Sequence, residues 1–138
     1  MSDEKQVILE SVKYMFRYWK TSLRWIFKRA RGGTEITVDA LFDRINSDQP
    51  PVLIDVRTAP EFNSKGHIPN AMSILVFELI SKLDLQEFKE KEIVTICEGG
   101  GLSLVAVDVM VEAGFKNVKS LKGGMNRWQR KGYPTTTS

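Results

Sequence analysis

The chain has 138 residues, of which 42% are hydrophobic and 27% are charged, and its formal net charge is +3. This length suits one domain with a short appendage, the composition excludes an intrinsically disordered chain, and no apolar run reaches the roughly 18 residues of a membrane span. Cys97 is the only cysteine, which excludes an internal disulfide, so we expect a cytoplasmic protein.

The positive charge is concentrated at the N-terminus. Residues 1–33 carry eight basic and three acidic side chains, a net charge of +5, whereas residues 34–138 carry 12 basic and 14 acidic side chains, a net charge of −2. Because the positive field is confined to one segment, the composition does not favour nucleic-acid binding by the domain. We divide the chain into an N-terminal segment with its Gly-Gly linker, residues 1–33, and a domain, residues 34–138.

The N-terminal segment predicts one basic amphipathic helix. Between Val7 and Arg31 there is no Pro or Gly, and at 100° per residue the basic side chains fall opposite a broad apolar arc. Gly32 and Gly33 end the pattern. Three roles stay open for residues 7–31: packing on the domain or on a second copy, lying peripherally on an anionic membrane surface, or docking to a partner protein. The oligomeric state is also open.

Beyond the linker, short apolar runs alternate with helical patterns. Extended segments are expected at the start of 35–45 and at 52–56, 66–74, 92–97 and 117–121. Helices are expected in the rest of 35–45, with Asp39 as N-cap, and at 58–65, 77–88, 103–114 and 123–134. This alternation predicts an α/β domain with a parallel sheet.

The stretch ICEGGGLSLV, residues 96–105, joins a predicted strand to a predicted helix and contains the only thiol. Catalytic groups gather at the carboxyl ends of parallel strands, which is where Cys97 lies. The three glycines allow backbone N–H groups to turn inward, and Ser103 is placed to cap the helix; both features favour a thiolate nucleophile. On these residues alone, a buried structural thiol beside a plain turn stays an equal alternative.

The sequence lacks the residues that a phosphate-binding, dinucleotide-binding or zinc site would need. The glycine-rich stretch lacks the Lys and the spacing of a phosphate-binding P-loop, and it lacks the G-x-G-x-x-G spacing of a dinucleotide site. One His and one Cys are too few for a zinc site. We therefore expect neither a metal nor a cofactor.

Two longer motifs follow one another in residues 35–134. LIDVRTAPEFNSKGHIPNAMSI is similar to D-V-R-x-x-x-E-[FY]-x-x-G-H-I-P-x-A with one extra residue before Gly66, and the stretch from Ile96 ends with a G-G-x-x-x-W helix. In this order they resemble the two signatures of the single-domain rhodanese family of sulfurtransferases. The resemblance implies a three-layer domain, with a central parallel sheet flanked by helices, here preceded by the basic amphipathic helix.

The resemblance also implies that Cys97 takes a sulfane sulfur from a small-molecule or protein persulfide donor and yields it to a thiol, cyanide or protein acceptor. In the family, sulfurtransferases have a six-residue loop, whereas related phosphatases have a seven-residue loop that ends with Arg. The six-residue loop here is Cys97 to Leu102, and neither Leu102 nor Ser103 is Arg. The substrate-binding residues of this active-site loop are expected to be Glu98, Gly99, Gly100, Gly101, Leu102 and Ser103. Its amides are expected to hold the transferred sulfur.

Two residues depart from the family pattern. Leu102 stands where Arg is common, and Glu98 adds a negative charge beside the nucleophile. Both changes weaken the attraction for a dianion, so we predict weak turnover of thiosulfate and a preference for a less anionic donor. The alternative is a catalytically weak rhodanese-like interaction module that its N-terminal helix docks to a membrane surface or a partner.

The remaining signature residues are expected to serve the scaffold. Asp55 and Arg57 support the loop or form a structural ion pair, Arg57 with Glu61 for instance. The resemblance implies that His67 is bonded within its own turn. Trp128 is expected to fill the core.

Overall fold

The structure, a computed structural model, describes residues 4–13, 34–81 and 83–138. Residues 34–138 build a five-stranded sheet in the order β1-β5-β4-β2-β3, with every neighbouring pair parallel. The strands are β1 (Glu35–Ile36), β2 (Val52–Asp55), β3 (Met72–Ser73), β4 (Glu92–Ile96) and β5 (Asn117–Leu121). The predicted parallel α/β sheet is therefore confirmed.

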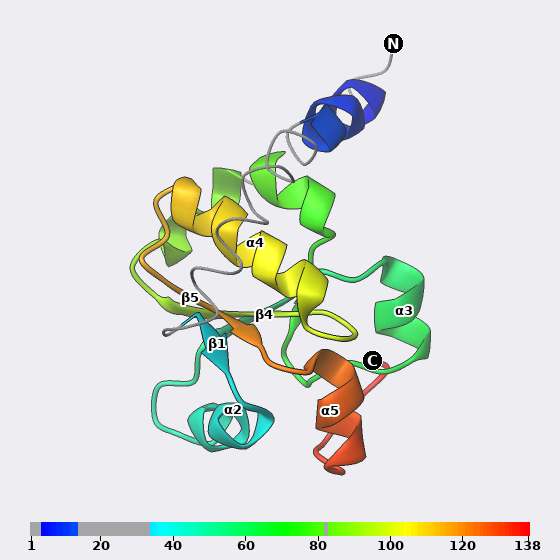
Figure 1. Ribbon diagram of the computed structural model, residues 1–138, viewed down its shortest axis with the longest axis vertical. Helices are drawn as coiled ribbons and strands as arrows, with labels where there is room; N and C mark the ends of the chain where they lie inside the picture. The colour runs from blue at the N-terminus through cyan, green and yellow to red at the C-terminus, as the bar shows by residue number, and fades with distance from the viewer. Residues whose placement is uncertain (1–3, 14–33, 82) are drawn as a thin grey trace.

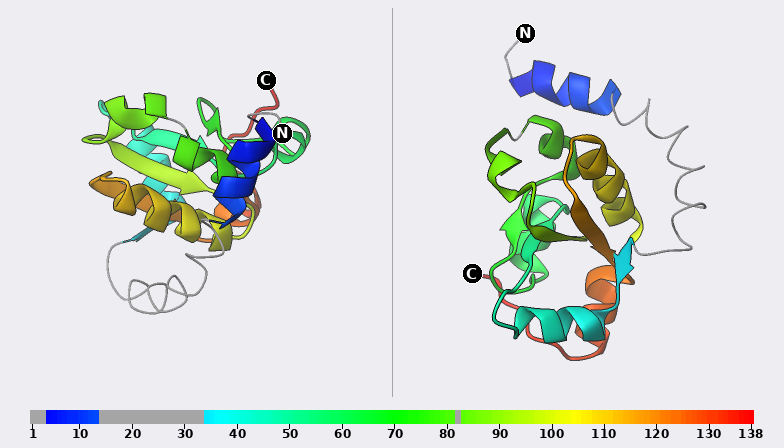
Figure 2. Two further views of the ribbon diagram at one scale, coloured as in Figure 1. Left: turned by 90° about the horizontal axis from the view of Figure 1, so that it is seen from above. Right: turned by 90° about the vertical axis from the view of Figure 1, so that its left-hand side faces the viewer.

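Helices cover both faces of the sheet and make three layers (Figures 1 and 2). α2 (Val38–Ile45) and α5 (Gly124–Arg130) pack on one face; α4 (Gly101–Glu112) and the 3-10 segments η1 (Val76–Ser81) and η2 (Leu83–Phe88) pack on the other. α3 (Ala59–Ser64) follows β2. Consecutive strand residues divide between two apolar cores, as Leu53 and Ile54 do, which is why the strands read as continuous apolar runs.

Trp128 lies in the core on the α2 and α5 face and is almost fully buried, as expected. Its indole N–H donates to the carbonyl of Pro134 at 2.9 Å, so the one polar atom of the ring is satisfied. The ring of Tyr133 packs beside it. Trp128 thus ties the end of the chain to the domain core.

Two helices begin elsewhere than predicted. Thr37, rather than Asp39, caps α2, because its hydroxyl accepts the N–H of Ala40 at 3.1 Å. Asp39 lies in the first turn, where hydrogen bonds from Tyr133 and then from Lys131 lower the pKa of its carboxyl. α4 begins at Gly101 with Gly100 as N-cap, so Ser103 is a first-turn residue rather than the cap.

The segment 77–88 was predicted as one α-helix, and the structure has η1 and η2 in its place. The hydroxyl of Ser81 donates to the carbonyl of Glu78 at 3.0 Å. An α-helix would need that carbonyl for a later backbone N–H, so the local bond competes with helix continuation. The prediction of a continuous α-helix here is wrong.

The N-terminal helix is present in the part of the chain that the structure describes. Residues 4–13 are helical and form α1, whereas residues 14–31 of the predicted helix lie outside the described residues. Three consecutive apolar side chains of α1, Val7, Ile8 and Leu9, are exposed. Within the described ranges, no helix is both long enough and apolar enough to cross a membrane.

Candidate active site

The candidate site lies at the carboxyl ends of β2 and β4, two neighbouring parallel strands. Asp55, the last residue of β2, pairs in register with Ile96, the last residue of β4. The chain continues beyond these ends into Arg57 and Cys97, so the register brings together side chains that are far apart in the sequence. An edge of this kind is where open α/β sheets place their ligand sites.

The sulfur of Cys97 accepts two backbone hydrogen bonds from its own loop. The N–H groups of Gly100 and Ser103 point at Sγ from 3.1 and 3.3 Å. Both dipoles stabilise negative charge on the sulfur, as in an anion-binding nest. Gly100 has a φ of 95°, and a Cβ there would come within 3.0 Å of the N of Gly123, so this curl of the loop requires glycine.

Buried hydroxyl groups lie behind the sulfur. The Oγ of Ser103 is 3.2 Å from Sγ and 2.6 Å from the Oγ of Ser120, which comes from β5. Thr95, on β4, donates its hydroxyl to the carbonyl of Ser103 at 2.8 Å. Ser103 was expected at the site from the sequence, whereas Ser120 and Thr95 were not. Each of these two is a hydroxyl residue within a predicted buried strand, and a buried hydroxyl needs a hydrogen-bond partner, which is the signal that could have indicated them.

The N-terminus of α5 holds the other side of the loop. The N–H groups of Met125 and Asn126 donate to the carbonyls of Cys97 and Glu98 at 2.9 and 3.0 Å. Gly124 makes the approach possible, because a Cβ at this position would overlap both carbonyl oxygens. The G-G-x-x-x-W motif therefore also positions the loop, because its second glycine allows the N-terminus of α5 to approach the loop backbone.

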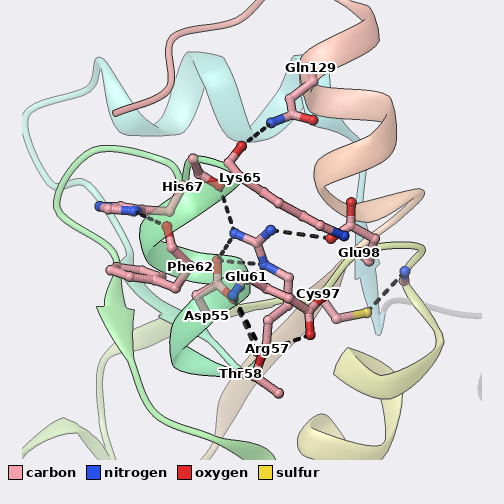
Figure 3. Close-up of polar contacts among 12 residues, drawn as sticks. Asp55, Arg57, Thr58, Glu61, Phe62, Lys65, His67, Cys97, Glu98 and Gln129 are labelled. Atoms are coloured by element: carbon pink, nitrogen blue, oxygen red, sulfur yellow. Dashed lines mark hydrogen bonds and ion pairs between the residues drawn. The ribbon is translucent and has the colours of Figure 1, made fainter. Parts of the chain in front are cut away.

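An ion-pair network reaches the loop from β2. The guanidinium of Arg57 donates to Asp55 through Nε at 3.0 Å and Nη2 at 2.9 Å, to the carbonyl of Gly66 through Nη2 at 2.8 Å, and to Glu98 through Nη1 at 3.2 Å (Figure 3). Burial by itself lowers the pKa of Arg57, but the hydrogen bonds and charges of Asp55 and then of Glu98 outweigh it and raise that pKa. Arg57 is therefore a charged link between β2 and the loop.

The suggested pairing of Arg57 with Glu61 is wrong, because Arg57 pairs with Asp55 and Glu98. The carboxylate of Glu61 instead accepts the hydroxyl of Thr58 at 2.9 Å, at the start of α3. Thr58 in turn caps that helix through the N–H of Glu61. The hydroxyl of Thr58 therefore bonds both the N–H and the carboxylate of Glu61 at the start of α3.

A cavity of about 270 Å³ opens beside Cys97. Much of its wall is apolar and comes from Val56, Leu75, Val76, Phe77 and Leu102. Its charged lining residues are Arg57, Glu61 and Glu98, all of which the structure describes. Arg57, the one cation among them, is already paired with two carboxylates, so the cavity offers apolar contact and little attraction for an anion.

His67 is bonded near its own turn, as the resemblance implied. Its Nδ1 is 2.9 Å from the carbonyl of Phe62, and its ring stacks on that of Phe62. Its backbone exchanges two hydrogen bonds with Thr136. The histidine is almost fully buried and is not among the residues that line the cavity.

Comparison with known proteins places this arrangement in a family context. The family model described as a rhodanese-like domain matches residues 37–131. The chain is 37% identical over 95 residues to the putative sulfurtransferase YtwF of Bacillus subtilis (strain 168), which covers 69% of this chain and 89% of that protein. It is 37% identical over 93 residues to the thiosulfate sulfurtransferase GlpE of Pseudomonas savastanoi pv. phaseolicola, which covers 65% and 82%. The solved rhodanese-like domain of an Anabaena protein is 28% identical and superposes with a TM-score of 0.69, over 78% of this chain and 81% of that one.

Proposed function

Because the chain belongs to the rhodanese-like family, we propose that it is a sulfurtransferase whose nucleophile is Cys97. In the first step the Cys97 thiolate attacks the outer sulfur of a donor R–S–SH; the S–S bond breaks, R–S⁻ leaves, and the persulfide Cys97–S–SH forms. In the second step an acceptor thiolate attacks that outer sulfur and releases the Cys97 thiolate. The transfer needs no external oxidant or reductant.

The observation that carries this proposal is the pair of N–H groups aimed at Sγ from Gly100 and Ser103. The sulfur of Cys97 is the attacking anion in the first step and the leaving anion in the second. The two backbone N–H groups, which already point at that sulfur, therefore stabilise its negative charge in both transition states. We assign the binding of the substrate to the loop from Glu98 to Ser103, four of whose residues line the cavity: Glu98, Gly99, Gly101 and Leu102.

Asp55 and Arg57 serve this loop as support. Their side chains are almost completely buried and form a two-bond ion pair, which the carbonyl of Gly66 completes. Removing one partner of such a pair costs roughly 3–5 kcal/mol of stability, because the other charge is left buried. We therefore assign both residues to the architecture of the site rather than to the transfer itself.

The preferred donor is a persulfide less anionic than thiosulfate, borne by a small thiol or by a protein. Apolar side chains form much of the cavity wall, and the carboxylates of Glu61 and Glu98 outnumber the single guanidinium. A thiosulfate dianion meets net repulsion there. One relative is named a thiosulfate sulfurtransferase, but this name gives the donor of the relative and not the donor of this chain.

Mass spectrometry of the intact protein tests the proposal. After incubation with cysteine persulfide, the wild-type chain gains one sulfur atom and loses it again on addition of cyanide, which leaves as thiocyanate. Cys97→Ser gains none, since it removes the only thiol. An unmodified wild-type protein, with persulfide and thiosulfate donors alike, would contradict the proposal.

A second candidate function is favoured by the exposed side chains of α1. Val7, Ile8 and Leu9 are 40%, 54% and 39% exposed, which leaves apolar surface for a membrane or another protein. In this reading residues 1–33 dock a rhodanese-like domain of residues 34–138, whose loop transfers sulfur slowly. The absence of sulfur labelling at Cys97 with every donor would favour this candidate over the first.

A further inference from the structure

Glu98 and Arg57 meet at the wall of the cavity, beside Cys97 (Figure 3). The three nitrogens of the Arg57 guanidinium fall into two groups by their partners. Nε and Nη2 are directed to Asp55 and to the carbonyl of Gly66, inside the domain. Nη1 is the nitrogen that bonds Glu98, at 3.2 Å.

The two halves of this network differ in how firmly they are held. The side chain of Asp55 is 0% exposed and that of Arg57 2%, whereas that of Glu98 is 35% exposed. Water therefore reaches this part of the network through the carboxylate of Glu98, whereas the guanidinium of Arg57 stays buried. The backbone of Glu98 is fixed separately, through its carbonyl and the N–H of Asn126.

We propose that Glu98 acts as an internal anion that occupies the Nη1 side of Arg57, and that it thereby excludes sulfonate-type dianions such as thiosulfate from the cavity. This rests on the proposed function and identifies the residue that sets its donor class. With the carboxylate gone, Nη1 faces the cavity as a charged donor that Asp55 and Gly66 already hold in place. A tetrahedral dianion then takes the position of the carboxylate.

The transfer chemistry with such a donor is balanced. The Cys97 thiolate attacks the outer sulfur of thiosulfate, the S–S bond breaks, and sulfite leaves with the electron pair as the Cys97 persulfide forms. The one negative charge of the thiolate and the two of the donor become one charge on the persulfide and two on sulfite. Arg57 would stabilise the sulfonate half, because negative charge grows there as the S–S bond breaks and sulfite leaves.

Three variants separate release of Arg57 from a general loss of negative charge. Glu98→Ala removes both the charge and the acceptor. Glu98→Gln removes the charge but keeps an amide oxygen that accepts from Nη1. Glu61→Ala removes a charge from the same cavity, but the Glu61 carboxylate bonds Thr58 and not Arg57.

The first readout is protection of Cys97 from iodoacetamide by sulfate, an unreactive dianion, at constant ionic strength. We expect the half-protecting sulfate concentration to fall about tenfold in Glu98→Ala, the worth of one charge-assisted hydrogen bond, and less than threefold in the other two variants. Equal protection in all three variants, or none in Glu98→Ala, would overturn the proposal. Thermal unfolding of each variant checks that the fold persists.

The second readout is selectivity, the ratio of kcat/KM for thiosulfate to that for cysteine persulfide. We expect this ratio to rise about tenfold in Glu98→Ala only. The sulfate experiment requires no sulfur transfer, so its result stands if the proposed function fails. Conversely, a persulfide-active protein without any sulfate effect would refute the role of Glu98 and leave the proposed function intact.

Discussion

Leu102 is the residue at which the loop differs most from an anion-binding loop. It lines the cavity and is 38% exposed, so a longer polar side chain there would reach the substrate without entering the core. Arg57 cannot replace the missing charge, because Asp55 and Glu98 already hold it. Leu102 thus limits how well the cavity attracts a dianion, in addition to the carboxylate of Glu98.

We predict that Leu102→Arg raises kcat/KM in the thiosulfate:cyanide reaction about tenfold, since an unpaired guanidinium would bind the sulfonate through two hydrogen bonds. Leu102→Gln is the matched control, of similar size and uncharged, and it should bring no such gain. Steady-state formation of thiocyanate measures both variants. High wild-type activity, with no gain in Leu102→Arg, would show that the loop already attracts thiosulfate.

Sequence reasoning located the thiol and its glycines but not their partners. Cys97 follows an apolar run and precedes three glycines, and these local features predict a strand end and an inward-turning loop. The bond from Arg57 to Glu98 joins residues 41 positions apart and depends on the register of β2 against β4. A local pattern contains no such register, so the sequence suggested Glu61, an acid four residues along the same segment.

At the scale of elements, the loop depends on how α5 begins. Gly124 has a φ of 56°, and a Cβ at this position would overlap the backbone of Cys97 and Glu98. Two N–H groups at this helix end then reach the loop carbonyls. The loop is thereby held through its carbonyls by α5 while its own N–H groups are turned toward the sulfur.

We predict that Gly124→Ala lowers the free energy of unfolding by about 2–4 kcal/mol, because the new methyl group meets backbone atoms and φ is positive. Gly132→Ala is the matched control: Gly132 follows α5, has a φ of 75°, and its Cβ would meet nothing within 4 Å. It should cost only about 1 kcal/mol, from the left-handed backbone alone. Urea denaturation measures the free energy of unfolding of both variants. Equal losses would contradict a tight contact between Gly124 and the loop backbone.

Predicting elements succeeded where burial dominates and failed where local hydrogen bonds decide. The apolar runs at 52–56 and 117–121 became β2 and β5, because strands covered on both faces need continuous apolar sequence. The N-cap of α2 is Thr37 rather than Asp39. Thr and Asp both favour the N-cap position, so residue type alone does not choose between them. In η1, the hydroxyl of Ser81 competes with a helix that the apolar spacing alone would allow.

At the scale of the whole molecule, the two apolar cores are built from the domain. Among the residues that the structure describes, all those that compose these cores lie between Ile36 and Tyr133. The family match, residues 37–131, spans nearly the same stretch. We therefore propose that residues 34–138 contain what the fold and the loop require, and that residues 1–33 serve a separate purpose.

We predict that a variant without residues 1–33 unfolds cooperatively and gains one sulfur at Cys97 as the full chain does. It should remain in the supernatant when sedimented with anionic vesicles at low salt, whereas the full chain sediments, since the deleted segment carries a net charge of +5 and the exposed apolar side chains of α1. Replacing Val7, Ile8 and Leu9 by Ser in the full chain keeps the charge and tests the apolar contribution. If the full chain also stays in the supernatant, the membrane role fails, and a protein partner or a second copy of the chain becomes the occupant to seek.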